Sequence, residues 1–538
     1  MAVVSNLVAT RRVAAIVAAL LLLDVSLSFH NVWPTPAVAW AGELSVELAV
    51  CLAVMALASR WWGPPTHVAL RWLAALWVVL VIGRYADVTA PALYGREVNL
   101  YWDVRHVSAV AAMLARVASF WQLLLALAVA VLIPLMLYAL LRWCLGRVSE
   151  AMGRPRHRRW LGGLAAAGVS LFVAQRIGGL SVGPNFSAPV TQTYWHQARL
   201  LVGGFTGRTA RTLGPSPSLD SDLSHVRGAD IVLMFLESYG AVSYDRPEIA
   251  RPLATARERF EADVRATGRD VVSAYVESPT FGGNSWLAHV SLLSGVEVRD
   301  EDTNTRLMAQ KRDTLVRMFA RHGYRTVAIM PGLHQSWPEG GFYGFDEIYG
   351  EARLDYRGPS FGWWNVPDQF TMARMDALEL ARQPRTPVFV FFPTIASHTP
   401  FSPTPPYQPD WARVLTKEPF EQVDLDRAWS ESPDWFDLGP SYVQALSYAY
   451  ASIGGYLRMR ADRDLVMILI GDHQPPAAVS GEQAGWDVPV HIVASRKAVI
   501  ATLLAHGFRT GMTPSRPSLS RMHALAPIVL DAFGTAAS

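Results

Sequence analysis

The sequence predicts a chain in two parts, an α-helical membrane domain at the N-terminus and an α/β domain with a mostly parallel central sheet at the C-terminus. Two observations lead to this fold class. Long apolar runs follow one another through the first 180 residues, and short apolar runs alternate with amphipathic stretches after residue 215. The hydrophobic fraction of 51% is high for a soluble protein, and the excess lies in the first part. The expected boundaries are a transmembrane domain over 1–180, a linker over 181–215 and a second domain over 216–538.

The first part contains five candidate membrane spans, since a spanning helix needs about 20 mostly apolar residues. The candidates are 13–31, 44–59, 67–84, 119–141 and 160–178. The third is the weakest because Arg71 and Arg84 frame a short apolar run. One such run could be a buried core helix, but five in series indicate a membrane domain. The first run, preceded by Arg11 and Arg12, also fits a cleaved signal peptide as an alternative.

Basic residues predict how the spans are oriented, because cytoplasmic loops carry an excess of Lys and Arg. The loop after the fourth span is crowded with arginines: Arg142, Arg147, Arg154, Arg156, Arg158 and Arg159. The first loop, 32–43, has no Lys or Arg. We therefore expect a multi-pass protein of the plasma (inner) membrane, with its N-terminus inside and the domain after residue 180 outside the cytoplasm, in the periplasm.

Charge and cysteine content exclude several classes of function. The net charge of +3 gives no reason to expect a nucleic-acid partner. The two cysteines, Cys51 and Cys144, both lie in the membrane part. A disulfide framework, a cysteine-rich zinc cluster and a cysteine nucleophile are therefore excluded from the second domain.

Six short apolar runs of the second domain are predicted strands: 231–236, 271–276, 326–330, 388–392, 465–470 and 488–493. Helical patterns lie between them, at 249–266, 312–321, 368–383 and 441–460. This alternation favours an α/β sandwich with a mostly parallel sheet. Ligands of such sheets bind at the carboxyl ends of the strands. Polar residues directly after strands are therefore the candidates for function.

Two of these strands end in acidic or imidazole side chains. Glu237 follows the run 231–236, where it could be a functional acid or an ordinary residue of a helix start. Asp472 and His473 follow the run 465–470 after a single glycine. Carboxylate and imidazole together form a common ligand set for a divalent metal. The alternative is a turn aspartate beside a histidine with a structural hydrogen bond.

A third cluster surrounds Ser285, which follows Gly282, Gly283 and Asn284 and precedes a helix-like run. Backbone N–H groups at a helix N-terminus favour an anionic group. A serine at that position is well placed to attack a phosphorus or sulfur centre. The alternative is a plain serine N-cap.

In this order, the three clusters resemble the alkaline-phosphatase/sulfatase superfamily. The closer resemblance is to its membrane branch, the lipoteichoic acid synthase-like phosphoglycerol transferases and the phosphoethanolamine transferases. Leu293-Ser294-Gly295 is similar to the Leu-Thr-Gly that follows the nucleophile of sulfatases. The resemblance implies about five spans and a C-terminal α/β sulfatase-like catalytic domain outside the cytoplasm. It also implies one divalent metal, Zn or Mn, and a catalytic Ser285, with Thr280 as the rival nucleophile. The implied metal ligands are Glu237, Ser285, Asp472 and His473.

The resemblance also suggests residues that contact substrate. His398, after the run 388–392, is similar to a histidine that faces the phosphate or leaving group. Trp337 resembles an aromatic of the phosphoglycerol pocket, although Glu339 stands where the synthases have Arg. The further substrate-binding candidates are His334, His289 and Asn284. His491, inside a predicted strand, is interpreted as structural.

The expected function is metal-dependent transfer of a phosphoglycerol or phosphoethanolamine head group from a phospholipid donor to a cell-envelope glycan or lipid acceptor, through a covalent serine intermediate. The alternatives are a membrane-bound phosphoester or sulfate-ester hydrolase with the same site, and a non-enzymatic scaffold. Trp286 to His289 lack the Pro/Ala-x-Arg pattern needed to convert Ser285 to formylglycine. We therefore expect Ser285 to act unmodified.

Overall fold

The computed structural model describes residues 2–108, 111, 112, 115, 120–179, 184–206, 213–334, 337–362, 365–431 and 433–535. The chain forms two compact units. The first consists of Met1–Ala92 and Glu97–Thr206, and the second of Leu93–Arg96 and Gly207–Ser538. The domain boundaries expected from the sequence stay a prediction.

The first unit consists mainly of apolar helices. They are α1 (Ala2–Val25), α2 (Val46–Trp61), α3 (His67–Tyr94), α4 (Leu100–Asp103), η1 (Val104–His106), α6 (Phe120–Met152), α7 (Pro155–Gly178) and α8 (Pro189–Thr206). Short strands pair as β1 (Phe29–Asn31) with β2 (Val38–Trp40) and β3 (Leu44–Ser45) with β4 (Phe186–Ser187). Within the described residues, three helices are long and apolar enough to cross a membrane: α3, α6 and α7. Helices of this kind are typical of a membrane protein.

The number of spans is not settled by these helices. Each of the five predicted spans overlaps a helix, although the first, 13–31, extends past the end of α1 at Val25 into β1. Helix α2 has 16 residues, so it is about 24 Å long and shorter than the roughly 30 Å core of a bilayer. The count of five therefore stays a prediction. The segment predicted as a linker contains the 18-residue helix α8.

One mixed sheet forms the centre of the second unit. Nine strands of the described chain build it: β5 (Asp230–Leu236), β6 (Asp270–Glu277), β7 (Arg325–Met330), β8 (Glu347–Gly350), β9 (Val388–Pro393), β10 (Leu465–Gly471), β11 (Asp487–Ala494), β12 (Arg509–Thr510) and β13 (Ser520–Arg521). Their order is β12-β6-β11-β10-β5-β9-β7-β8, and β13 also pairs with β6. The block β10-β5-β9-β7-β8 is parallel, whereas β11 runs antiparallel to both β10 and β6. The six predicted strands and the mostly parallel sheet are confirmed.

The central strands are apolar along most of their length because both faces of the sheet are covered. In β5 all seven residues are buried. Ile231 and Leu233 point into one hydrophobic core, and Val232 and Met234 point into the other. Alternate side chains of a strand point to opposite faces, so a strand between two cores is mostly apolar.

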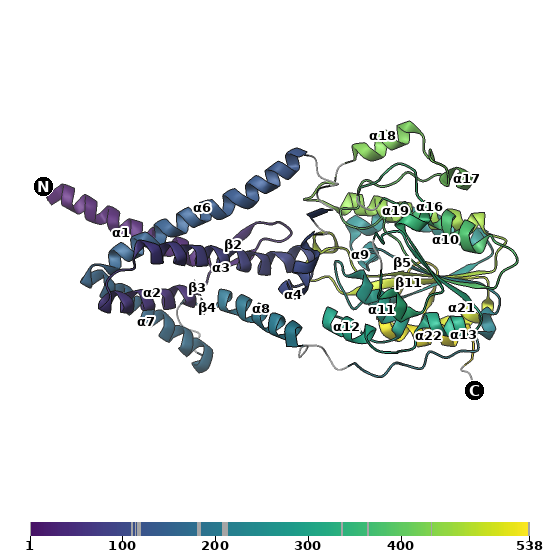
Figure 1. The fold of residues 1–538 in the computed structure, drawn as a ribbon, viewed down its shortest axis with the longest axis horizontal. Coiled ribbons are helices and arrows are strands. Elements are labelled where there is room, and N and C mark those ends of the chain that lie inside the picture. The colour runs from purple at the N-terminus through teal and green to yellow at the C-terminus, as the bar shows by residue number, and fades with distance from the viewer. Residues whose placement is uncertain are drawn as a thin grey trace. The chain divides into compact units, whose positions relative to one another are not determined.

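Helices pack on both faces of the sheet, as Figure 1 shows. One face carries α11 (Ser285–Ser294), α13 (Leu315–Arg321), α21 (Lys497–Ala505) and α22 (Leu525–Phe533). The other carries α10 (Pro247–Ala266), α16 (Asp368–Met375) and α19 (Gly439–Met459). Shorter elements connect them: η2 (Ser224–Val226), α9 (Val242–Asp245), α12 (Glu301–Met308), α14 (Gly340–Tyr343), α15 (Glu351–Leu354), η3 (Asp376–Leu380), α17 (Trp411–Val414), α18 (Gln422–Ser430), α20 (Ala477–Ser480) and η4 (Met522–Ala524). With both faces covered, the strand ends are where polar side chains can lie next to solvent.

Candidate metal centre and nucleophile

Three neighbouring parallel strands end at the same edge of the sheet, and each is followed by polar residues. Strand β5 leads to Glu237, β10 to Asp472 and His473, and β9 to His398. Because β5 lies between β10 and β9, these side chains come together although they are far apart in the sequence. Gly471 permits the closest approach, since a Cβ atom there would collide with the carbonyl oxygen of Tyr239.

Glu237, Asp472 and His473 form one compact buried group. One ligand atom from each lies within 4.8 Å of the others. The Nε2 atom of His473 is 3.5 Å from Oε1 of Glu237 and 3.7 Å from Oδ2 of Asp472. Relative exposure is 8% for Glu237 and 1% for each of the other two. The structure thus brings together the three residues that the strand ends predicted.

Backbone hydrogen bonds fix how this group faces inward. Oδ1 of Asp472 accepts from the N–H groups of Ser238 at 2.8 Å and His473 at 2.7 Å. Nδ1 of His473 lies 2.7 Å from the carbonyl oxygen of Gln474. A proton on Nδ1 suits that carbonyl and leaves the lone pair of neutral His473 on Nε2, toward the two carboxyl groups.

The electrostatics of the group fit a divalent cation. Burial and the charge of Glu237 raise the pKa of Asp472 to about 7. Burial alone would lower the pKa of His473, but the carboxyl groups of Asp472 and Glu237 outweigh it and the pKa is raised. Both shifts arise because acidic groups share a small buried space, which a bound cation compensates. Carboxylate oxygen and imidazole nitrogen are ligands that zinc and manganese accept.

Ser285 lies at the edge of this group. Its Oγ donates a hydrogen bond to Oε2 of Glu237 at 3.1 Å and lies 3.2 Å from Nε2 of His473. Ser285 is the first residue of α11, and its side chain is partly exposed while the acids are buried. Gly282, Gly283 and Asn284 all have positive φ, at 64°, 143° and 60°. This backbone turn aims the start of α11 at the metal group.

Thr280, the rival nucleophile, has a different surrounding. It is 5% exposed, and its Oγ1 donates to the carbonyl oxygen of Gly283 at 2.6 Å. The hydroxyl thereby holds the turn that precedes Ser285. The geometry therefore favours Ser285 as the reactive hydroxyl and Thr280 as a support of its loop.

Two predicted histidines lie near the metal group. Asp472 and His473 both affect the pKa of His398 and of His289. His398 is partly exposed, its Nδ1 lies 2.8 Å from the carbonyl oxygen of Thr399, and burial lowers its pKa. His289 lies one turn after Ser285 on α11, and burial lowers its pKa to about 4. Its Nε2 is buried without a hydrogen-bond partner among the described residues.

The remaining predicted residues follow β7, two strands away from β5. His334 pairs with Glu351, with 2.5 Å between Nδ1 and Oε2. Trp337 packs its ring on Tyr343 with the centroids 5.4 Å apart. Their contact with substrate stays a prediction, as does that of Asn284, which caps α11.

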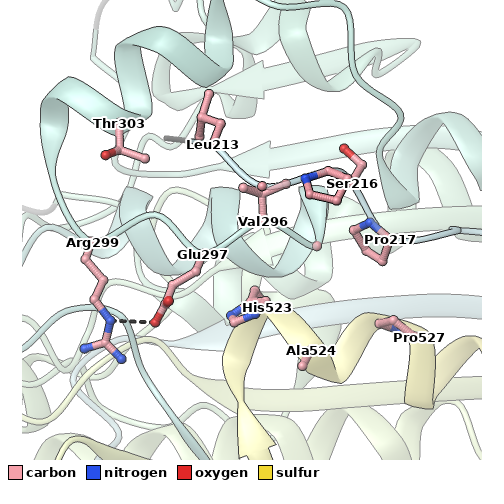
Figure 2. Close-up of a pocket in the computed structure, with 13 residues that line it drawn as sticks. Leu213, Ser216, Pro217, Val296, Glu297, Arg299, Thr303, His523, Ala524 and Pro527 are labelled. Atoms are coloured by element: carbon pink, nitrogen blue, oxygen red, sulfur yellow. Dashed lines mark hydrogen bonds and ion pairs between the residues drawn. The ribbon is translucent and has the colours of Figure 1, made fainter. Parts of the chain in front are cut away.

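A surface hollow of about 490 Å³ lies elsewhere in the second unit, between the segment 213–217, the residues after α11 and the start of α22. Figure 2 shows Arg299 paired with Glu297 at its side, with 2.6 Å between Nε and Oε1. Glu297 also pairs with Arg521. Glu297 and Arg299 are thus paired with each other, and His523 also lines the hollow.

The sequence patterns did not reveal the residues that hold Glu237 in place. Its N–H donates to Oγ1 of Thr394 at 3.1 Å, and its carbonyl accepts from Oγ of Ser397 at 2.6 Å. Ser238 donates through Oγ to Oε1 of Glu237 at 2.9 Å, and Tyr442 donates to the carbonyl of Ser238 at 2.8 Å. Only Ser238, directly after the acid, could have been suspected from the sequence.

Comparison with known proteins gives one family match. The Sulfatase family model matches residues 289–492. No curated protein sequence is similar enough to count as a match.

Several solved structures are similar at low identity. The integral membrane lipooligosaccharide phosphoethanolamine transferase A from Neisseria meningitidis is 14% identical, with 83% of this chain and 80% of that chain covered and a TM-score of 0.43. The lipoteichoic acid synthase LtaP from Listeria monocytogenes is 14% identical, covering 60% of this chain and 78% of that one, with a TM-score of 0.38. An alkaline phosphatase superfamily protein from Vibrio parahaemolyticus is 18% identical over 54% of this chain, with a TM-score of 0.37, and the match spans 66% of its length. Residues 289–492, less than half of the chain, are thus similar to the Sulfatase family, in agreement with the resemblance predicted from the sequence.

Proposed function

We propose that the protein transfers a phospho-head group, phosphoglycerol or phosphoethanolamine, from a membrane phospholipid to a cell-envelope glycan or lipid. The observation that carries the proposal is the position of Ser285. Its hydroxyl lies at a helix N-terminus, 3.1 Å from Glu237 and 3.2 Å from His473. The Sulfatase match and the candidate membrane helices support a membrane enzyme of this superfamily.

One divalent cation, zinc or manganese, would be held by Glu237, Asp472, His473 and the Ser285 hydroxyl. Bound there, such a cation lowers the pKa of a hydroxyl and neutralises phosphoryl oxygens. The chain itself contributes orientation. Glu237 accepts the Ser285 hydrogen bond, and Ser285 lies at the N-terminus of α11, a position that favours an anionic head group.

The proposed reaction has two steps that balance in protons. First, Oγ of Ser285 forms a bond to phosphorus, the bond from phosphorus to the diacylglycerol oxygen breaks, and the Ser285 proton ends on that oxygen. Second, the acceptor hydroxyl attacks the serine phosphodiester, and its proton returns to Oγ of Ser285. His398 is proposed as the proton carrier in both steps, because it follows β9 at the same edge of the sheet as the metal group.

A membrane location suits such a donor. Phospholipid head groups lie at the bilayer surface, and candidate spans such as α3, α6 and α7 would keep the enzyme next to them. We propose that the protein lies in the plasma (inner) membrane and that the second unit faces the periplasm. His289, His334, Trp337 and Asn284 are proposed to contact the head group or the acceptor.

The test uses the detergent-solubilised full chain, supplied with zinc or manganese and with labelled phosphatidylglycerol or phosphatidylethanolamine. Intact mass and diacylglycerol release are measured for wild type, Ser285→Ala and Thr280→Val. Wild type should carry a head-group adduct, and Ser285→Ala should lose diacylglycerol release on the order of 1,000-fold or more. Thr280→Val should keep the adduct, since Thr280 only holds the loop.

Two outcomes would contradict the proposal. An adduct retained by Ser285→Ala and lost by Thr280→Val would make Thr280 the nucleophile. Turnover of a soluble phosphate or sulfate ester, with no adduct and no diacylglycerol from either lipid, would make the protein a hydrolase.

A further inference from the structure

Ser238 connects two of the three side chains in the metal group. Its Oγ donates to Oε1 of Glu237 at 2.9 Å. Its N–H donates to Oδ1 of Asp472 at 2.8 Å. A single buried residue, 1% exposed, therefore contacts carboxyl groups from strands β5 and β10.

The backbone of Ser238 has an unfavourable conformation, which contacts with neighbouring residues must hold in place. Its φ is 55°, which residues other than glycine rarely adopt. Tyr442 of α19 holds it there, because its hydroxyl donates to the carbonyl oxygen of Ser238 at 2.8 Å. Strained backbone of this kind persists where the surrounding structure fixes it, and it is concentrated at functional sites.

The hydrogen bonds of Ser238 and its neighbours give particular carboxyl oxygens of Glu237 and Asp472 defined partners. On Asp472, Oδ1 already accepts two N–H groups, so Oδ2 is the atom that faces Nε2 of His473, 3.7 Å away. On Glu237, Oε1 accepts the Ser238 hydroxyl, and Oε2 accepts the Ser285 hydroxyl. The orientation of both carboxyl groups is thus fixed before any ligand arrives.

We propose that Ser238, held by Tyr442, is a positioning residue that sets the metal affinity of the centre by orienting Glu237 and Asp472. The inference rests on the proposed metal site and extends it to a residue that does not touch the metal. Hydrogen bonds to ligating carboxylates keep them in place for binding, and losing one such bond costs about 10- to 100-fold in metal affinity.

Three variants separate the hydroxyl from the backbone strain. Ser238→Ala removes the hydroxyl and keeps the strained φ. Ser238→Gly removes the hydroxyl and relieves the strain, because glycine adopts positive φ freely. Ser243→Ala is the matched control, since Ser243 is a fully buried serine whose hydroxyl donates to the carbonyl of Gly240 at 2.8 Å.

The experiment is isothermal titration calorimetry of the chelator-stripped full chain in detergent with zinc chloride and with manganese chloride. The melting temperature of each metal-free variant is recorded alongside. Ser238→Ala and Ser238→Gly should both bind about 10- to 100-fold more weakly than wild type. Ser243→Ala should bind as wild type, although its metal-free melting temperature falls.

Each contrary result has a distinct meaning. Wild-type affinity in both Ser238 variants, with only a lower melting temperature, would show a merely structural role and overturn the inference. Weakened binding in Ser238→Ala and wild-type binding in Ser238→Gly would assign the effect to backbone strain and overturn the role of the hydroxyl. Asp472→Asn is the negative control and should bind neither metal. If the wild-type chain also binds neither metal, the metal site itself is overturned.

Discussion

Burial acts differently on the histidines of the catalytic domain, depending on which groups surround each imidazole. His473 faces two carboxyl groups, and its pKa is raised. His491 is buried among neutral groups, with Nδ1 2.6 Å from Oγ of Ser273 and Nε2 2.9 Å from the hydroxyl of Tyr239. Burial and the positive charge of Arg257 lower the pKa of His491 to about 3. The sequence interpretation of His491 as structural agrees with this neutral network inside β11.

The pKa of His491 predicts how stability depends on pH. Above the unfolded pKa of about 6.5, the imidazole is neutral in both states and makes no pH-dependent contribution. Below it the unfolded chain binds a proton that the folded chain does not, so stability falls as pH falls from about 6.5 toward 3. The loss attributable to His491 should reach about 2 kcal/mol at pH 5.

Thermal unfolding of wild type and His491→Gln at pH 7, 6 and 5 measures this contribution. The variant should be less stable than wild type at pH 7, because a buried network is disturbed, but its melting temperature should fall less between pH 7 and pH 5. Parallel curves for the two proteins would show that other groups cause the acid sensitivity.

At the scale of elements, the sequence predicted the strands and missed the shorter pieces. The six predicted runs are mostly apolar, with Ser273, Thr326 and His491 as exceptions, because burial on both faces of the sheet leaves a nearly continuous signal. Strand β8 spans only Glu347–Gly350 and β12 only Arg509–Thr510, too short for a pattern to emerge. Helix α8 covers the one helix that the sequence suggests within the linker, over 193–205, and begins earlier, at Pro189.

The residues of the candidate site that directly follow predicted strands could be predicted from the sequence. Glu237, Asp472 and His473 follow the runs directly, so a parallel sheet must place them at one edge. Thr394, Ser397 and Tyr442 hold Glu237 and Ser238 through hydrogen bonds from side-chain hydroxyls to backbone groups that are remote in sequence. Such hydrogen bonds cannot be predicted from a residue pattern, and only the structure shows them.

The start of β5 is held by a buried ion pair, which predicts a specific loss of stability. Asp230 accepts from Arg385 at 2.6 and 2.5 Å and from the N–H of Val388 at 3.0 Å. Arg385→Met would leave the Asp230 charge buried and unpaired, which costs about 3–5 kcal/mol. The measurement is the melting temperature of the full chain in detergent.

The matched control is Arg357→Met. Arg357 pairs with Asp355, and the relative exposure is 62% for the Arg357 side chain and 48% for the Asp355 side chain. Exposed pairs contribute little, so this variant should melt like wild type. Equal losses in both variants would show that the Arg385 pair does not anchor the sheet.

On the scale of the whole molecule, the decisive property is which side of the membrane the second unit occupies. The natural cysteines are Cys51 and Cys144, both in the first unit. In a chain with both changed to alanine, Ser495→Cys places a thiol at an exposed position after β11. Gly153→Cys places one at an exposed position in the arginine-rich loop between α6 and α7.

The two thiols should respond in opposite ways to a membrane-impermeant maleimide applied to intact spheroplasts. Ser495→Cys should be labelled, since the second unit is proposed to lie outside the cytoplasm. Gly153→Cys should be labelled only after detergent is added, because loops rich in arginine stay inside. The reverse pattern would place the catalytic domain in the cytoplasm.

The strand order also determines when the centre can come into being during synthesis. The N–H of Ser238 meets Asp472 across 234 residues of sequence, and contacts of such long range form slowly because a long loop must close first. A nascent chain that ends before residue 472 contains Glu237 and Ser285 but lacks Asp472 and His473. The reactivity proposed for the centre is therefore withheld until synthesis has passed residue 473.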